Sequence, residues 1–498
     1  MKRYDVRTYN LNELVALFAI GSHGASNSSI ENKPQIKYLH KYINSLGAKS
    51  LVYEDEYIDR HFLEDFAGYY SRCFTSYPRF CSRIHVFKQK FSARKLQNYI
   101  RRGASLNELG YLGFLVVKPL PNTIIGRSCL ARPETPDWSG AFPCSLNISP
   151  HLYGMRGKVE SNPFQEQDHE VSACATTALW TALASSGNLF THAVPSPYKI
   201  TKTAHMNSQF EHRSMPNDGL TSSQIARAID AIELEPTIFT ATSKELLPAG
   251  LYAYLRGGVS PILGFEFDPL IADTSGERHA VAVTGYRLSE TSPSTTNRLR
   301  LRSSRIDRFY AHDDGIGPYS PIEFENGQLV TSWIRPGDPE ENERWKAKPF
   351  LSIVPLYHKI RTPLVDVYNA TRELDSIFRL FVANHDELEW DIFLTNNASF
   401  KKEVRDDMPD INGDKIDLLS KNLPRFLWRI ICRFNDGEPI FEIALDATDL
   451  RQGGQVISYL IYNDQFCDSI AAKMKRFDLS NLKASSLGCF MRAKLRGE

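Results

Sequence analysis

The stretch from Gln165 to Ser186, QEQDHEVSACATTALWTALASS, constrains the fold more than any other part of the chain. A polar run leads to Cys174, and from there the residue types favour a helix. Apolar residues recur with the spacing of a buried helical stripe at Ala175, Ala178, Leu179, Ala182 and Leu183. Ser172 is a suitable N-cap. We therefore expect Cys174 in the first turn of a buried helix.

A cysteine at this position has two interpretations. Free cysteine is among the most buried residue types and packs as a small hydrophobe, so the position alone favours a core residue. In the first turn of a helix, however, unpaired N–H groups and the helix dipole favour the thiolate, which is the nucleophilic form. A catalytic Cys174 needs a histidine partner and a third group that orients the histidine.

Two later segments can supply these partners. His279 begins the alternating strand RHAVAVTGYRL, and Asp313 ends a later strand in FYAHDDG, directly before Asp314. A helix start, a strand start and a strand end can meet in an α+β domain. The plain alternatives are a buried His279 bonded to a backbone carbonyl and an Asp313 that only shapes a turn, because Asp-Asp-Gly is itself a turn signal.

The order of these segments resembles the papain-like cysteine peptidases, and most of all the bacterial bacteriocin-processing peptidases. The matching segments lie within residues 160–335: Gln167 ahead of Cys174, PSPYKI, GGVSPILGFEF, HAVAVTGY from His279, and FYAHDD, which ends at Asp313 or Asp314. The resemblance implies an α+β fold in which a Cys-led helix packs on an antiparallel sheet. It also implies acyl transfer to Cys174, proton transfer by His279 and orientation of the ring by Asp313.

The resemblance further implies that Gln167 donates to the oxyanion. Gln167 stands one residue further from Cys174 than the family spacing, and alanines flank Cys174 where a neighbouring glycine is common in the family. His169, Gln165 or backbone N–H groups alone are therefore alternative oxyanion donors.

The length of 498 residues suggests roughly two to four domains. We expect a mainly helical N-terminal region over 1–130, with helices at 11–20, 34–46, 58–70 and 93–102 and a hairpin near its end. A connector with five prolines follows over 131–163, as an irregular or wrapping segment. The papain-like core spans 164–348. A β-rich C-terminal region spans 349–498, with a hairpin turn at Asn435-Asp436-Gly437.

Charge is balanced, with 59 basic and 58 acidic residues, which gives no reason to expect a nucleic acid partner. No phosphate-binding loop, dinucleotide motif or zinc spacing is present, so we expect neither a cofactor nor a metal. No apolar run is long enough to span a membrane. Eight scattered cysteines without a CxxC pair favour a reduced, cytoplasmic protein.

The sequence therefore predicts a cysteine peptidase-like hydrolase, held as a regulated effector, that cleaves a peptide or isopeptide bond. Its expected partners are a protein or peptide substrate and a regulatory protein. Two alternatives stay open. The core could be a catalytically weak scaffold that binds a protein, or an acyltransferase or transglutaminase-like enzyme with the same three residues.

Overall fold

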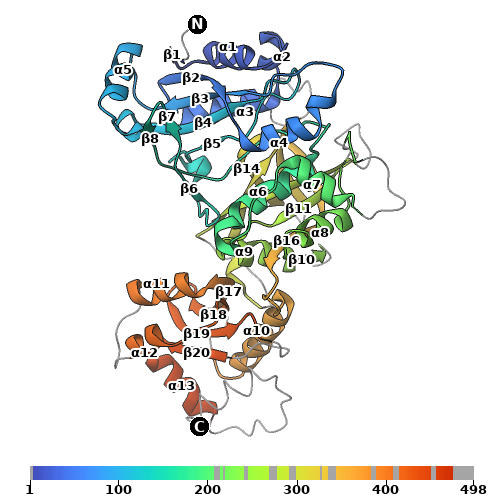
Figure 1. The fold of residues 1–498 in the computed structure, drawn as a ribbon. Coiled ribbons are helices and arrows are strands. Elements are labelled where there is room, and N and C mark those ends of the chain that lie inside the picture. The colour runs from blue at the N-terminus through green and yellow to red at the C-terminus, as the bar shows by residue number, and fades with distance from the viewer. Residues whose placement is uncertain are drawn as a thin grey trace. The chain divides into compact units, whose positions relative to one another are not determined.

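The computed structural model describes residues 4–206, 214–216, 219–240, 245–268, 277–290, 299–325, 328–334, 344–382, 388–407, 414–449 and 456–474 (Figure 1). The protein is a mixed α/β protein with antiparallel sheets, and helices and strands make up 36% and 33% of the described residues. The chain forms two compact units. The first contains residues 1–239, 259–287 and 308–355, and the second contains 240–258, 288–307 and 356–498.

The N-terminal part of the first unit is an antiparallel sheet in the order β1-β2-β3-β4-β5. Its strands are β1 (Tyr4–Thr8), β2 (Ser50–Tyr57), β3 (Cys81–Phe87), β4 (Tyr111–Val117) and β5 (Cys129–Leu130). The accompanying helices are α1 (Leu11–Gly21), α2 (Asn27–Glu31), α3 (Pro34–Ser45), α4 (Arg60–Gly68), η1 (Tyr70–Arg72), α5 (Ala93–Arg101) and η2 (Leu106–Leu109).

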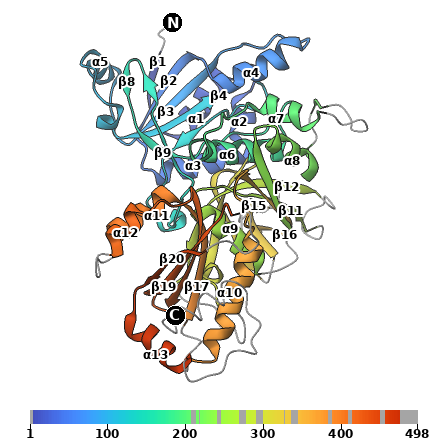
Figure 2. The same cartoon turned by 60° about the horizontal axis from the view of Figure 1, so that its bottom comes forward.

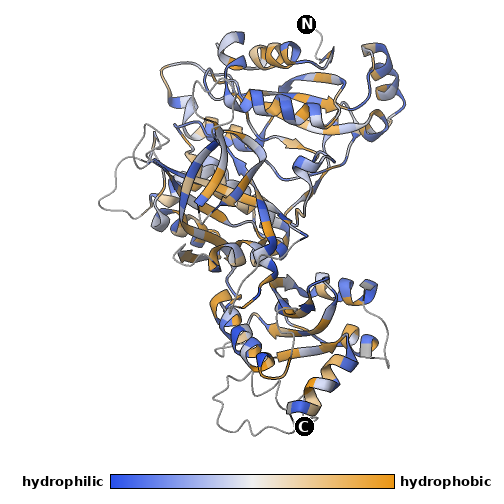
Figure 3. Ribbon diagram, turned by 180° about the vertical axis from the view of Figure 1, so that it is seen from behind, coloured by the Kyte–Doolittle hydropathy of each residue, from blue (hydrophilic) through white to orange (hydrophobic). Residues whose placement is uncertain are grey.

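The four expected helices and the β4–β5 pairing are thus present, and the region also contains strands β1, β2 and β3, which the sequence did not predict. The missed strands β2 and β3 form the middle of the sheet. Strand β3 is buried at every position and β2 at its first four, so neither shows the alternation that marks a half-buried strand. The helices in Figure 3 carry both hydrophobic and hydrophilic residues. This amphipathic pattern predicts a helix from the sequence alone.

The proline-rich segment 131–163 is part of the first unit and is not a free linker. It forms η3 (Pro136–Trp138) and the short strands β6 (Leu146–Ile148), β7 (His151–Leu152), β8 (Met155–Arg156) and β9 (Val159–Ser161). Its apolar residues Trp138, Phe142 and Met155 are buried. Residues 131–163 therefore fit the expected wrapping segment better than a connector between two domains.

The remaining sheet of the first unit closes into a six-stranded antiparallel barrel in the order β11-β12-β13-β14-β15-β16, and β10 extends it from β16. Its strands are β10 (Leu234–Thr240), β11 (Ile262–Phe267), β12 (Arg278–Leu288), β13 (Ile306–Asp313), β14 (Gly317–Glu325), β15 (Gln328–Ile334) and β16 (Arg344–Tyr357). The strands before and after His279 thus pair directly with the histidine strand.

Three helices accompany the barrel: α6 (Cys174–Phe190), α7 (Pro197–Ala204) and α8 (Ser222–Asp230). Helix α6 packs on β11, as the expected Cys-led helix should. It is buried on all sides over Ala175–Ser186, which is typical of a central helix. Helix α8 begins with a capping box, in which Thr221 and Gln224 satisfy one another's backbone N–H groups.

The second unit is built on the antiparallel sheet β17-β18-β19-β20 (Figure 2). Its strands are β17 (Leu388–Asn396), β18 (Phe426–Phe434), β19 (Pro439–Asp446) and β20 (Val456–Ile461). Its helices are α9 (Leu246–Arg256), η4 (Arg302–Arg305), α10 (Leu364–Arg379), α11 (Asn397–Asp407), α12 (Asp414–Ser420) and α13 (Asp464–Met474). Helix α9 belongs to this unit, although its residues fall within the span 164–348 that was expected to form the core.

Candidate active site

Cys174 is the first residue of helix α6 and is partly exposed. The N-cap is Ala173, which offers no side-chain cap, so the prediction that Ser172 caps this helix is wrong. The Ser172 hydroxyl instead lies 3.2 Å from both Asp168 Oδ1 and the Asp168 backbone N. The first N–H groups of α6 therefore have no side-chain acceptor at the cap, and Cys174 stands at the end of the helix where a negative charge is stabilised.

Asp168 holds the loop that presents Cys174, and sequence reasoning missed it. Its Oδ1 accepts hydrogen bonds from the backbone N–H groups of Glu170, Val171 and Ser172, at 3.2, 2.8 and 2.7 Å. Its Oδ2 accepts the Tyr70 hydroxyl at 2.8 Å. Asp168 is buried, so these bonds satisfy the carboxylate inside the protein. The sequence signal was an Asp followed by a short polar run, which is typical of an Asx turn.

His279 stands at the start of strand β12, where the alternation predicted it, with only 7% of its side chain exposed. Its Nε2 lies 3.0 Å from Asp313 Oδ1. Because an ionised carboxylate only accepts, Nε2 carries the hydrogen of this bond. Cys174 also lies close enough to the ring to contribute to the rise of the His279 pKa.

The neighbours of His279 favour the protonated form of its ring. Burial of the ring lowers its pKa, but the charge and hydrogen bond of Asp313 and the contact with Cys174 outweigh burial and place the pKa of His279 well above 6.5. Aromatic rings enclose it: the ring centroids of Phe265, Phe267 and Trp333 lie 5.5, 6.1 and 5.5 Å from that of His279. We therefore expect an imidazolium beside the Cys174 side chain at neutral pH.

Asp313, at the end of strand β13, is buried and fully hydrogen-bonded. Besides His279, its Oδ1 accepts the backbone N–H of Gly315 at 3.0 Å, and its Oδ2 accepts the Trp333 indole Nε1–H at 2.8 Å. A Cβ on Gly315 would lie 2.1 Å from the Trp333 ring, so only glycine allows this approach. Sequence reasoning missed Trp333 because it lies on β15, in a segment that carried no motif.

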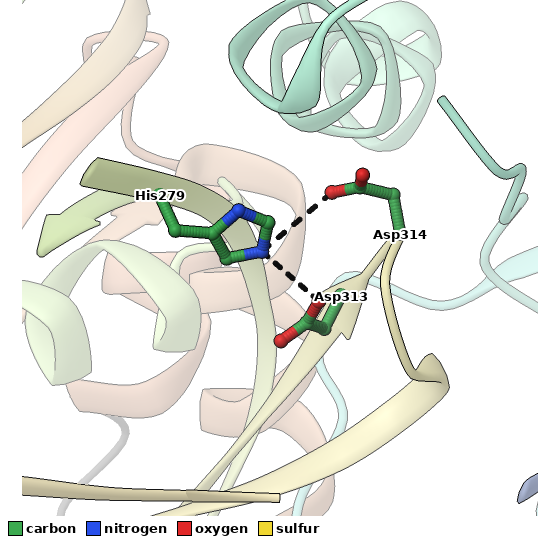
Figure 4. A group of neighbouring side chains, drawn as sticks. All are labelled: His279, Asp313 and Asp314. Carbon is green, nitrogen blue, oxygen red and sulfur yellow. Dashed lines mark hydrogen bonds and ion pairs between the residues drawn. The ribbon is translucent and has the colours of Figure 1, made fainter. Parts of the chain in front are cut away.

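Asp314 follows on the loop, and Figure 4 shows its carboxylate turned toward the same histidine nitrogen. Its Oδ1 lies 3.7 Å from His279 Nε2, beyond a hydrogen bond, and its Oδ2 has no hydrogen-bond partner. Burial raises the pKa of Asp314 to about 7, the His279 charge opposes this rise, and Asp313 adds to it. Asp313 is therefore the carboxylate that is hydrogen-bonded to His279, and Asp314 is a second acid beside it that lies beyond hydrogen-bond distance.

The expected oxyanion donors are placed differently. The side chain of Gln167 makes no hydrogen bond among the described residues, and His169 stands in the loop with a left-handed backbone, φ 58°. Gln165 is buried, and its Nε2 has no hydrogen-bond partner. A buried N–H group without a partner is costly unless a ligand satisfies it. Gln165 therefore stays a donor candidate, as does the partly exposed Gln167.

His279, Asp313 and Asp314 also form a group that could hold a metal ion, because one ligand atom of each lies within 4.8 Å of the others. Two features do not favour a metal. His279 Nε2 and Asp313 Oδ1 stand at hydrogen-bond distance from one another. Both Asp313 oxygens already accept hydrogen bonds. The donor set fits a hydrogen-bonded pair better than a metal centre.

Comparison with known proteins gives no family for this chain. No protein-family model matches the sequence, and no curated protein is significantly similar to it. Within the part of the chain that the structure describes, no helix has the length and apolar character needed to cross a membrane. The chemistry of the site must therefore be argued from its own geometry.

Proposed function

We propose that the protein is a papain-like cysteine hydrolase that cleaves a peptide or isopeptide bond through an acyl-enzyme on Cys174. One observation carries this proposal: the His279 ring is hydrogen-bonded to the buried carboxylate of Asp313, and Cys174, which begins a helix, lies close enough to act on the pKa of the ring. This is the nucleophile, base and orienting group that thiol catalysis needs.

The chemistry follows from these contacts. His279 holds the proton of Cys174, and the thiolate attacks the substrate carbonyl carbon to form a C–S bond. The imidazolium gives its proton to the leaving nitrogen as the C–N bond breaks. His279 then takes a proton from water, whose hydroxyl adds to the thioester carbon, and the thiolate leaves. Asp313 orients the ring throughout and does not touch the substrate.

Two arrangements support stabilisation of the oxyanion. The first N–H groups of helix α6 lie next to Cys174 and have no side-chain cap. Gln165 offers an unsatisfied, buried amide donor. The Cys-led helix packed on an antiparallel barrel supports the papain-like assignment, because that family places its nucleophile in the same way.

The test is hydrolysis of a library of unstructured peptides and isopeptide-linked pairs, with products identified by mass spectrometry in water enriched in ¹⁸O. We expect cleavage with one ¹⁸O in each new carboxyl group, and none with Cys174→Ala. Products joined to added glycinamide in place of ¹⁸O would identify the acyltransferase alternative. Cleavage that persists in Cys174→Ala, or a wild type as inert as this variant, would overturn the proposal.

A further inference from the structure

The first unit contains a cavity of about 830 Å³ that does not include Cys174 or His279 in its lining. Its walls come from helix α3, the segment around Trp138 and strands β14, β15 and β16. Aromatic and apolar side chains form much of its wall, including Tyr38, Trp138, Ile316 and Trp333. Its volume and mixed wall are typical of cavities that enclose a small organic ligand.

The cavity shares a wall with the candidate active site. Trp333 lines it and, through Nε1, donates to Asp313 Oδ2 at 2.8 Å. The turn after Asp314 packs closely against two aromatic rings of the cavity wall. A Cβ atom on Gly315 would lie 2.1 Å from the Trp333 ring, and a Cβ atom on Gly317 would lie 2.3 Å from the Tyr38 ring. A molecule in the cavity would therefore rest against the side chain that holds the orienting carboxylate.

The charges around the cavity are mainly positive. Two carboxylates, Asp137 and Glu323, face four basic side chains: Lys37, Lys41, Arg308 and Arg344. Glu323 accepts hydrogen bonds from both arginines, at 2.6 and 2.8 Å, so their charges are partly compensated. The two lysines stand one helical turn apart on α3 and make no ion pair among the described residues. The excess of positive charge selects an anion.

We propose that this cavity binds a small organic anion with a planar ring, and that its occupant acts on His279 and Asp313 through Trp333. The ring packs on the aromatic wall, and the anionic group meets Lys37 and Lys41. Trp333 Nε1 is bonded to Asp313 in the structure, and the proposed coupling includes a second state in which the indole is turned away. A ligand seated against the bonded state favours that state by its difference in affinity. It therefore holds Asp313 in place on His279 and favours the thiolate form of Cys174.

Binding is tested by calorimetry with 2-naphthoate, and with 2-naphthalenemethanol as a neutral probe of the same size. We expect 2-naphthoate to bind with a dissociation constant of about 1 mM or lower, as a ligand of this size allows. The alcohol should bind at least about fivefold more weakly. The variant Lys37→Glu/Lys41→Glu should weaken 2-naphthoate at least about tenfold. Lys90→Glu, an exposed lysine elsewhere in the first unit, should leave its affinity within about twofold.

The anion site would be overturned by any of three results: equal affinity for both probes, an affinity for 2-naphthoate that does not change in Lys37→Glu/Lys41→Glu, or no binding at all. This outcome does not depend on the proposed function, because calorimetry requires no activity of Cys174.

Coupling is tested by the rate of Cys174 alkylation with iodoacetamide at pH 7, with and without saturating 2-naphthoate. We expect the probe to raise the rate at least about twofold. Trp333→Phe keeps a ring in the cavity wall but removes the Nε1–H bond to Asp313. It should bind 2-naphthoate within about fivefold of the wild type, and the probe should no longer change its alkylation rate. An unchanged rate in the wild type, or the same increase in Trp333→Phe, would overturn the coupling.

Discussion

In the first unit the buried carboxylates Asp313 and Asp314 lie against a histidine, whereas in the second unit Glu389, Asp391 and Glu442 lie against arginines. The arginine network is extensively paired. Arg429 binds Glu442 with two hydrogen bonds, at 2.6 and 2.9 Å. Asp391 accepts from Arg256, Arg433 and Tyr252, and Glu389 accepts from Arg302 and Arg305.

The difference is one of chemistry rather than burial. A guanidinium stays charged at any pH that a protein meets, so the arginine network has a fixed charge and serves structure. An imidazole gains or loses its proton near neutral pH, and Asp314 has an oxygen without a partner. The histidine cluster therefore has the features expected of a reacting site. The predictions below test this contrast.

The largest effect is expected at the nucleophile. Cys174→Ala should lower the cleavage rate by at least about 10⁴-fold, because no other group can form the acyl-enzyme. The side chain is partly exposed, so the free energy of unfolding should change by less than about 1 kcal/mol. Peptide cleavage and urea unfolding on the same preparation measure both quantities. If Cys174→Ala is destabilised but still cleaves peptides, Cys174 has a structural role and is not the nucleophile.

The second unit should respond in the opposite way. Asp391→Ala leaves buried arginines without their carboxylate, so it should lower the free energy of unfolding of this unit by about 3–5 kcal/mol. Alkylation of Cys174 in the folded protein should stay at the wild-type rate. Glu438→Ala, an exposed acid on the neighbouring turn, is the matched control and should stay within about 0.5 kcal/mol of the wild type. If Asp391→Ala stays folded but its Cys174 is alkylated at a different rate from the wild type, the arginine network is not purely structural.

The proximity of His279 and Asp313 could be predicted from the sequence, because both stand at strand ends with clear alternation before or after them. Trp333 could not be predicted, since it donates to Asp313 from a different strand. Asp168 and Gly315 bond within their own loops, to Ser172 and Asp313, and the sequence did not mark these local bonds as parts of the site. The expected Ser172 cap was wrong because Asp168, four residues earlier, takes the hydroxyl. The closure of six strands into a barrel was also beyond reach, because Ile262 of β11 pairs with Ile353 of β16, and a pairing over such a distance in the sequence leaves no local signal.

Within the histidine cluster, the two neighbouring aspartates should differ. Asp313→Asn should lower turnover by about 10²–10⁴-fold, because the amide no longer holds the imidazolium. Asp314→Asn should lower it by less than about tenfold, since Asp314 Oδ1 lies 3.7 Å from the ring. The ratio of kcat values at one pH decides between them. If Asp314→Asn is the more damaging change, Asp314 is the orienting group; if neither matters, the site works with Cys174 and His279 alone.

The smallest expected effect is on stability against pH, and the two regions should differ in sign. The raised pKa of His279 gives stability that is full below about pH 6.5 and is lost as pH rises through its folded value. Asp314 adds to this trend, because its pKa of about 7 means that the folded state binds its proton more tightly. Its contribution falls as pH rises from about 4 to 7.

Asp391 should do the reverse. Burial raises its pKa, but the Arg256 charge and the other guanidinium groups outweigh burial and leave the pKa of Asp391 below its usual value of 3.8. Its stabilisation is therefore full above about pH 4 and is lost as pH falls through the folded value. Urea unfolding of His279→Gln and Asp391→Asn against the wild type across the pH range measures both slopes. If the stability contributed by His279 and that contributed by Asp391 change with pH in the same direction, the expected contrast between the histidine cluster and the arginine network is wrong.

The rate of Cys174 alkylation by iodoacetamide as a function of pH tests the central claim most directly. With His279 as an imidazolium held by Asp313, we expect the wild type to react quickly and at a nearly constant rate between about pH 6 and 8. His279→Ala should react slowly there and become faster only toward pH 8.5, as an ordinary thiol does. A wild type that follows the ordinary thiol curve, or a Cys174 that never reacts while the protein is folded, would contradict the account and leave a scaffold in place of an enzyme.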